Sequence, residues 1–252
     1  MTRKTASDVA AMEKVGRLAA ETLKYAGSFI KAGMTTDEID KIVHEYTLSK
    51  GAKPAPLGYH GFPKASCTSV NEVVCHGVPD STVLKEGDIV NLDVTCILNG
   101  FHGDTSRTFF VGEVSDAAKN ITEAAFEAMN KGIEQVKAGN TTGDIGFAIN
   151  KYVTRRGYHI VRDIGGHGIG KKFHEEPFVP SYGKKGKGSK LIKWGCLTVE
   201  PMINETDARI IEHDIKDSSI KWYTTEDNCL SAQFEHTVLI TDEGYQILTL
   251  CD

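Results

Sequence analysis

The 252-residue chain has 40% hydrophobic and 25% charged residues, a composition that excludes a disordered or fibrous protein. A net charge of −5 gives no electrostatic reason to expect specific binding of nucleic acid, and no apolar run reaches the roughly 18–20 residues that a membrane span needs. Because the first residues lack a secretory signal and the six cysteines contain no C-x-x-C pair, the sequence predicts a cytoplasmic protein with reduced thiols.

Two helices are predicted at the start of the chain. The segment from Ser7 to Ala32 carries apolar residues at helical spacing, and Gly33 is the expected residue after its C-terminal cap. Thr35 and Glu38 then form the pattern of a capping box, which begins a second helix with its own apolar face.

Strand-like sequence follows these helices. The run Asp88–Leu98 is strand-like and ends at Asn99-Gly100, the strongest short signal for a hairpin turn. The segment Gly103–Val111 is the expected return strand. The first half of the chain therefore combines a helix pair with an antiparallel hairpin.

An internal repeat gives the second half the same organisation. The residues Lys31–Ile39 recur as Lys137–Ile145, at an offset of 106 positions from residue 31 to residue 137. The segments Ser115–Ala138 and Asp144–Arg155 repeat the helix pair around it. Two homologous halves explain this similarity better than chance identity does.

The second half also contains a second predicted strand pair. Its strands are Cys196–Ile203 and Ser231–Thr241, separated by a longer polar insertion. We therefore predict an α+β fold in a single domain spanning residues 1–252. Its pseudo-symmetric halves, about residues 7–111 and 115–252, would each place a helix pair on an antiparallel sheet.

Four acidic residues occupy related places in the two strand pairs. Asp93 and Glu200 lie inside apolar strand sequence, and the partner strands add Asp104 and Glu235. Carboxylates that converge on one buried pocket cannot all stay ionised unless cations neutralise them. Two divalent ions would do so where the halves meet, and His167, in a glycine-rich segment, is the candidate fifth ligand. Mixed carboxylate and imidazole ligation favours Co, Mn, Fe or Zn.

Eight ordered sequence runs, spread over nearly the whole chain, carry a resemblance to a known family. They are Leu57–Pro63, Asn71–Gly77, Asn91–Val94, Phe101–Ser106, Gly166–Gly170, Phe173–Pro177, Val199–Met202 and Leu230–Thr237. In these runs the chain closely resembles the type I methionine aminopeptidases, which are metallopeptidases of the pita-bread fold. The resemblance implies two pseudo-symmetric halves with a dinuclear metal site between them, in agreement with the repeat.

The resemblance implies a role for each candidate metal ligand. Asp93 would hold one divalent ion, His167 and Glu200 would hold the other, and Asp104 and Glu235 would bridge the two. It also implies a monovalent cation near Asn71, Val73 and Ser231.

The resemblance further implies catalytic and substrate-binding residues. Glu200 would move the proton to the leaving amide nitrogen, His174 would donate to the carbonyl oxygen, and His76 would contact the scissile nitrogen. Phe62 stands where the family commonly has tyrosine. The implied substrate-binding residues are His76, His174, Tyr59, Phe62, Cys67, Phe173 and Trp222.

The activity implied by the resemblance is removal of N-terminal methionine from nascent proteins by metal-hydroxide hydrolysis, with a small second residue preferred. The implied partners are nascent polypeptide N-termini, with contact to the ribosome surface left open, and the protein is expected to be a monomer without membrane or specific nucleic-acid partners. We interpret the lysine-rich segment Lys184–Lys193 as a solvated loop. Two alternatives stay open: a non-catalytic binding protein of the pita-bread fold, and an aminopeptidase of another specificity.

Overall fold

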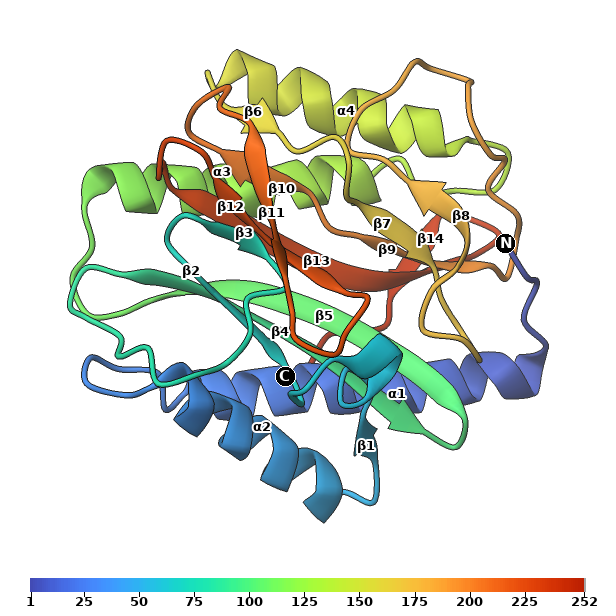
Figure 1. The fold of residues 1–252 in the computed structure, drawn as a ribbon. Coiled ribbons are helices and arrows are strands. Elements are labelled where there is room, and N and C mark those ends of the chain that lie inside the picture. Colours follow the sequence, from blue (N-terminus) through green and yellow to red (C-terminus); the bar gives the residue numbers. More distant parts are fainter. Residues whose placement is uncertain (252) are drawn as a thin grey trace.

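The helices of the chain form two pairs. The computed structural model describes residues 1–251. Helices α1 (Ala6–Gly27) and α2 (Thr36–Ser49) form the first pair, and α3 (Asp116–Ile133) and α4 (Thr142–Arg155) form the second. In Figure 1 the first pair runs below the strands and the second pair runs above them. Within residues 1–251, no helix combines the length and apolar character that crossing a bilayer requires.

Capping boxes begin α1, α2 and α4. At the start of α2 the N–H of Thr35 donates to Glu38 Oε2 at 2.7 Å, and the N–H of Glu38 donates to Thr35 Oγ1 at 3.2 Å. These bonds give partners to backbone N–H groups that the first helical turn leaves unpaired. The predicted start of the second helix is therefore confirmed.

Helix α1 is shorter than its apolar pattern predicts. It ends at Gly27 rather than near Ala32, and turns and irregular backbone follow it up to Gly33. The N–H of Gly33 donates to the carbonyl of Leu84 at 2.8 Å, outside the helix. Tertiary pairing with the loop before β4 thus ends the helix before the apolar pattern does.

The strands form one long sheet and one small sheet. The long sheet has the order β1-β4-β5-β13-β9-β7-β8, with β2, β6, β10 and β14 paired beside it, and the small sheet has the order β11-β12-β3. A short 3-10 helix covers Tyr59–Gly61. The strand bounds are β1 Lys53–Pro54, β2 Cys67–Val70, β3 Val73–Cys75, β4 Ile89–Leu98, β5 Phe101–Phe110, β6 His159–Ile160, β7 Gly166–Gly168, β8 Glu175–Val179, β9 Cys196–Val199, β10 Met202–Asn204, β11 Ile210–Asp214, β12 Lys221–Thr225, β13 Ser231–Ile240 and β14 Tyr245–Ile247.

Strand β13 joins the two halves of the chain. The predicted hairpin of β4 and β5 belongs to the first half, and β13 pairs antiparallel with β5 on one side and with β9 on the other. In this register Glu235 lies opposite Ser106, and His236 lies opposite Val199. The two predicted strand pairs therefore meet at the boundary of β5 and β13.

Each helix pair packs on the strands of its own half. Met12 of α1 belongs to the same buried cluster as Leu92 and Val94 of β4, and Ile121 of α3 belongs to a second cluster with strands β9 and β13. Burying one such side chain contributes about 1.5–3 kcal/mol. Because successive side chains of a strand point to opposite faces, the burial of Leu92 and Val94 against the helices turns Asp93 to the other face.

The second strand pair differs from its prediction in two respects. The expected strand Cys196–Ile203 is interrupted at Glu200 and Pro201, and proline has no N–H to donate to a neighbouring strand. The expected polar insertion Asn204–Tyr223 contains β11 and part of β12, and β12 pairs with β3 of the first half. Glu200 therefore lies in a break between two strands.

Candidate metal centre

Two adjacent rows of side chains cross the sheet on the face opposite the helices. The first row runs through residues that lie directly opposite one another on neighbouring strands. Strand β9 extends this row. His236 lies opposite Val199 in antiparallel register, so Glu200 continues the row next to Glu235. The first row consists of Cys67, Asp93, Ser106 and Glu235, continued by Glu200.

The second row lies two residues along each strand from the first row. Asp104 lies opposite Thr95 in the hairpin, and its N–H is bonded to Thr237 Oγ1 at 3.1 Å. Thr237 lies opposite Thr198, whose Oγ1 accepts from the N–H of His167 at 3.0 Å. The second row therefore brings Asp104 and His167 beside the three acids of the first row.

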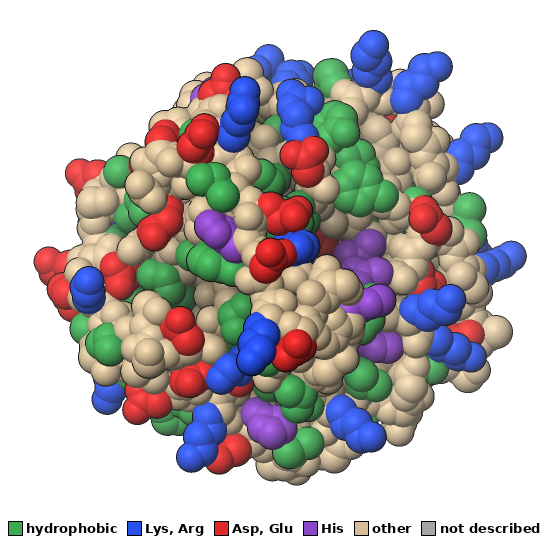
Figure 2. Space-filling model, in the orientation of Figure 1, with side chains coloured by type: hydrophobic (Ala, Val, Ile, Leu, Met, Phe, Trp, Pro, Cys, Tyr) green, Lys and Arg blue, Asp and Glu red, His purple; other side chains and the backbone are tan. Residues whose placement is uncertain are grey.

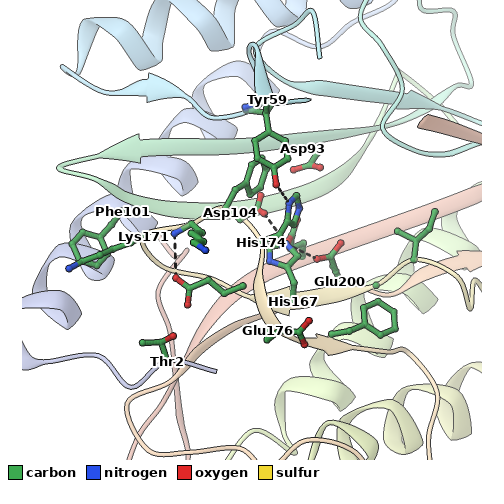
Figure 3. A pocket seen from close by; sticks show the side chains of 18 of the residues that line it. Thr2, Tyr59, Asp93, Phe101, Asp104, His167, Lys171, His174, Glu176 and Glu200 are labelled. Atoms are coloured by element: carbon green, nitrogen blue, oxygen red, sulfur yellow. Dashed lines mark hydrogen bonds and ion pairs between the residues drawn. The ribbon is translucent and has the colours of Figure 1, made fainter. Parts of the chain in front are cut away.

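The five predicted metal ligands converge. Nε2 of His167 lies 3.6 Å from Asp104 Oδ2 and 3.6 Å from Glu200 Oε1. Ligand atoms of Asp104, His167 and Glu235 all lie within 4.8 Å of one another. In Figure 3 Asp93, Asp104, His167 and Glu200 point toward a common centre. The predicted convergence of acids from both halves is therefore present.

The donor set fits divalent cations. Asp93 Oδ1 and Glu235 Oε1 are buried and have no hydrogen-bond partner among the described residues. A buried polar atom without a partner costs about 1–3 kcal/mol, so such atoms need an explanation. A cation between these oxygens would supply the missing partner, and carboxylate with imidazole is the ligation that Mn, Fe, Co and Zn accept.

The acids repel one another. Burial and the charges of Asp104 and Glu200 raise the pKa of Asp93 well above its usual range, and burial with the same two charges raises the pKa of Glu235 well above its own. Burial also raises the pKa of Glu200. Burial acts to lower the pKa of His167, but the hydrogen bond to Asp104 and the charge of Glu200 together have the larger effect, so the pKa of His167 is raised. Without cations this site therefore favours proton uptake, and bound metal ions would compete with those protons.

Threonine hydroxyls orient two of the carboxylates. Thr95 Oγ1 donates to Asp104 Oδ1 at 2.6 Å, and Thr198 Oγ1 donates to Glu200 Oε1 at 2.6 Å. Sequence reasoning missed both threonines, although each lies two residues from a predicted ligand in strand sequence. Their donation favours the ionised carboxylates, which are the forms that bind a cation.

Glycines allow the close approach of the strand that carries His167. A Cβ atom at Gly166 would lie 2.3 Å from the carbonyl oxygen of Thr198, and one at Gly168 would lie 2.4 Å from that of Glu176. No side chain fits at either position. The glycine-rich run around His167 therefore serves the packing of β7 between β8 and β9.

A cavity of about 820 Å³ opens over the acids. Figure 2 shows histidine side chains gathered at a hollow to the right of centre on this face. The cavity is lined by the five predicted metal ligands and also by six of the predicted substrate-binding residues, Tyr59, Phe62, Cys67, His76, Phe173 and His174. Phe62 and Cys67 are buried in its wall. Pockets of this size and mixed character are typical of small-ligand sites.

Trp222 is the one predicted pocket residue that does not line this cavity in the described chain. It packs against the cluster of Phe62, Cys67 and Ile215, and its ring stacks on His213 at a centroid distance of 4.2 Å. Ile220, two residues earlier on the same segment, reaches the cavity instead. The role of Trp222 in substrate binding stays a prediction.

His76 has an unusual backbone conformation. Its φ is 55°, in the left-handed region that non-glycine residues seldom adopt. Its Nδ1 lies 2.9 Å from the carbonyl oxygen of Lys221, which fixes the ring and leaves Nε2 free for a further contact. Burial lowers the pKa of His76. Backbone strain of this kind occurs preferentially at functional sites, because the surrounding structure must hold it in place.

His174 lies in the loop between β7 and β8 and lines the same cavity. Its Nδ1 is 2.8 Å from the hydroxyl of Tyr59, and its ring contacts that of His167 at 4.3 Å (Figure 3). The protein around the ring removes water from it, and this desolvation together with the charge of His167 lowers the pKa of His174 to about 4. The imidazole is therefore neutral at pH 7 in the metal-free protein.

The predicted monovalent-cation residues also lie together. The N–H of Ser231 donates to the carbonyl of Asn71 at 2.9 Å, and Val73 begins β3 close by. Asn71 has a φ of 51°, and Ser231 Oγ is buried without a partner among the described residues. An unpartnered hydroxyl beside backbone carbonyls is compatible with a small cation.

Comparisons with known proteins agree with this geometry. Residues 10–242 match the family model described as metallopeptidase family M24. The chain is 46% identical over 246 residues to a methionine aminopeptidase of Rickettsia prowazekii, covering 98% of this chain and 94% of that protein. It is also 46% identical over 244 residues to methionine aminopeptidase A of Synechocystis, covering 96% and 95%.

Solved structures show the same architecture. The crystal structure of methionine aminopeptidase from Rickettsia prowazekii matches with a TM-score of 0.96 at 45% identity, covering 99% of this chain and all of that one. A prolidase from Pyrococcus horikoshii matches with a TM-score of 0.79 at 23% identity, covering 99% of this chain but 64% of that one, and this likeness concerns the fold alone. The predicted α+β pita-bread fold is confirmed.

Proposed function

The chain belongs to metallopeptidase family M24, and on this basis we propose that it is a metal-dependent aminopeptidase that removes N-terminal methionine from polypeptides. The observation that carries the proposal is the convergence of Asp93, Asp104, His167, Glu200 and Glu235 from both halves of the chain on one cavity. We further propose that residues 1–252 act as one catalytic domain, because neither half contains the whole ligand set.

We propose that Asp93 would hold one divalent ion, that His167 and Glu200 would hold a second, and that Asp104 and Glu235 would contribute to both. Asp104 and Glu235 are suited to bridging because they lie on β5 and β13, the strands at the boundary of the halves. Divalent ions at this site would polarise the scissile carbonyl and lower the pKa of water toward neutrality. A monovalent cation beside Asn71, Val73 and Ser231 is a separate part of the proposal.

The protein groups supply orientation and proton transfer. Glu200, held by Thr198 and bordering the cavity, is the proposed carrier of the proton to the leaving amide nitrogen. His174 is the proposed donor to the carbonyl oxygen. If the Tyr59 hydroxyl donates to Nδ1 of His174, the ring proton resides on Nε2, which can then donate to substrate. His76 is the proposed contact of the scissile nitrogen.

The cavity wall suits a methionine side chain. Tyr59, Phe62 and Phe173 supply aromatic rings and Cys67 supplies a buried sulfur. A thioether gains about 0.3–1.5 kcal/mol from each favourable contact with an aromatic ring. Specificity for methionine follows the names of the relatives. Preference for a small second residue follows the family resemblance of the sequence, and both belong to the proposal.

Peptide hydrolysis tests the proposal directly. Purified protein is loaded with Mn²⁺ or Co²⁺ and incubated with the peptides Met-Ala-Ser and Ala-Pro-Pro, with and without EDTA. Release of free methionine from the first peptide alone, lost on chelation, is the expected result. Cleavage of Ala-Pro-Pro would support an aminopeptidase of other specificity. If the metal-loaded protein leaves both peptides uncleaved, a non-catalytic binding protein is supported instead.

A further inference from the structure

A buried ion pair lies beside the loop that carries Phe173 and His174. Nζ of Lys4 is 3.0 Å from Glu175 Oε2, and the two side chains are only 5% and 13% exposed. Lysine is almost never buried without a partner, so this contact fixes the N-terminal segment against the loop. Glu175 directly follows His174 in the chain.

The ion pair lies over Gly170, where the absence of a side chain leaves room for it. A Cβ atom at Gly170 would lie 2.1 Å from Lys4 Nζ and 2.8 Å from Glu175 Oε1. A side chain at position 170 would therefore force the lysine amine to move from its present place. The backbone of Gly170 is itself held, because its carbonyl accepts from the N–H of His102 at 2.9 Å.

Each end of the pair is anchored to a different part of the fold. The N–H of Lys4 donates to the carbonyl of Trp194 at 2.7 Å, at the turn before β9. Glu175 Oε1 accepts from the N–H of Lys172 at 3.3 Å, which closes the loop on itself. The pair therefore connects the loop to the scaffold on one side, while the Tyr59 hydroxyl contacts His174 from the other.

The same N-terminal segment forms part of the cavity wall. Thr2 and Lys4 both line the cavity with His174, and Figure 3 shows Thr2 at the lower left, away from His167 and Glu200. We propose that Lys4 is a positioning residue, whose ion pair with Glu175 over Gly170 holds His174 at the distance from the metal centre that the proposed aminopeptidase reaction requires. This inference rests on the proposed function for its catalytic consequence, but the position of the His174 ring can be measured without it.

The expected consequence of breaking the pair is a loss of turnover with the metal site intact. Small displacements of a catalytic group cost about 10- to 100-fold in rate when geometry is the limiting factor. We expect Lys4→Met to lower kcat by about that factor and to affect KM less, because Phe173 lies in the loop but Phe62 and Cys67 of the cavity wall lie outside it. Within residues 1–251, Lys4 forms its ion pair with Glu175 and none with the proposed ligands, so the metal content is expected to stay at the wild-type value.

A stabilising role alone would give a different pattern in the double variant. Removing one member leaves a buried unpaired charge, whereas removing both does not. Lys4→Met combined with Glu175→Gln is therefore expected to recover most of the lost Tm but not the lost kcat. Gly170→Ala displaces the amine while both charges remain, and it is expected to reproduce the loss of kcat. Lys131→Met is the matched control, since it breaks an exposed pair on α3, 2.7 Å from Glu134, and is expected to change nothing.

The test combines steady-state kinetics on Met-Ala-Ser with metal content, Tm and the His174 ring resonances in the metal-free protein. Low kcat in Lys4→Met and in the double variant, with shifted His174 resonances, supports the inference. A kcat within about twofold of wild type in Lys4→Met, or recovery of kcat together with Tm in the double variant, overturns it. If the wild-type protein releases no methionine, the proposed function fails, and unchanged His174 resonances in Lys4→Met then overturn the positioning role as well.

Discussion

Substitution of Glu235 by glutamine is expected to stabilise the metal-free protein while removing its ability to gain stability from metal ions. Among the described residues, Glu235 Oε1 is buried without a hydrogen-bond partner. Burial, and then the charges of the neighbouring acids, raise the pKa of Glu235 well above its usual range. Glutamine cannot ionise, and avoiding the cost of one such buried polar group is worth about 1–3 kcal/mol. For a chain of this size 1 kcal/mol shifts Tm by about 2–4 °C, so Tm in EDTA should rise by about 2–12 °C. With metal in hundredfold excess over Kd, each wild-type site gains about 2.7 kcal/mol and the order reverses.

The pH dependence of this difference has a definite sign. The folded state binds the Glu235 proton more tightly than the unfolded state, so the destabilisation is absent below the unfolded pKa of about 4.3 and grows as pH rises through the raised folded pKa. The advantage of Glu235→Gln should therefore be largest at alkaline pH and vanish near pH 4. Calorimetry from pH 5 to pH 9, in EDTA and separately with added Mn²⁺, measures this difference in Tm. Substitution of the exposed Glu123 on α3 by glutamine is the control. A lower Tm for Glu235→Gln in EDTA at pH 8 would refute the account of repelling acids.

Four further substitutions separate the proposed roles. Asp104→Asn is expected to abolish metal binding and activity together, because it removes a bridging carboxylate; retained metal in elemental analysis would contradict that role. His76→Ala should leave both ions bound and slow turnover, and a fall in metal content would make His76 a ligand instead. His174→Gln should lower kcat by about 10²–10³-fold at unchanged metal content, the loss typical of a missing donor to a developing oxyanion, as stopped assays on Met-Ala-Ser would measure. Thr198→Val leaves Glu200 without its 2.6 Å donor and should weaken metal affinity by about 10–100-fold in a calorimetric titration, with wild-type affinity counting against an orienting role.

Periodicity and duplication made most of the fold predictable. The repeat located both helix pairs, the Asn99-Gly100 turn located the hairpin of β4 and β5, and acids inside apolar strand sequence located Asp93 and Glu200. These signals are local or lie at a fixed offset, so they can be read from the chain. Burial of Leu92 and Val94 under α1 then turns Asp93 to the opposite face, as alternation along a strand requires.

Features that depend on contacts distant in sequence could not be read in the same way. The pairing of β12 with β3 joins segments about 150 residues apart, and no sequence pattern in either strand indicates which strand it pairs with. Thr95 and Thr198 resemble any other threonine of a strand until the register puts their hydroxyls against Asp104 and Glu200. Lys4 likewise looks like a surface lysine, and only its distance to Glu175 distinguishes it.

The central position of β13 has a consequence for biosynthesis. This strand carries Glu235 and inserts between β5 and β9, so it is translated after both of its neighbours. A chain still lacking that strand has Asp93 and Asp104 on one sheet fragment and His167 on another, with no direct strand pairing between the two fragments. The proposed ligand set is therefore complete only after β13 has inserted, so its assembly depends on one of the last segments of the chain to be synthesised.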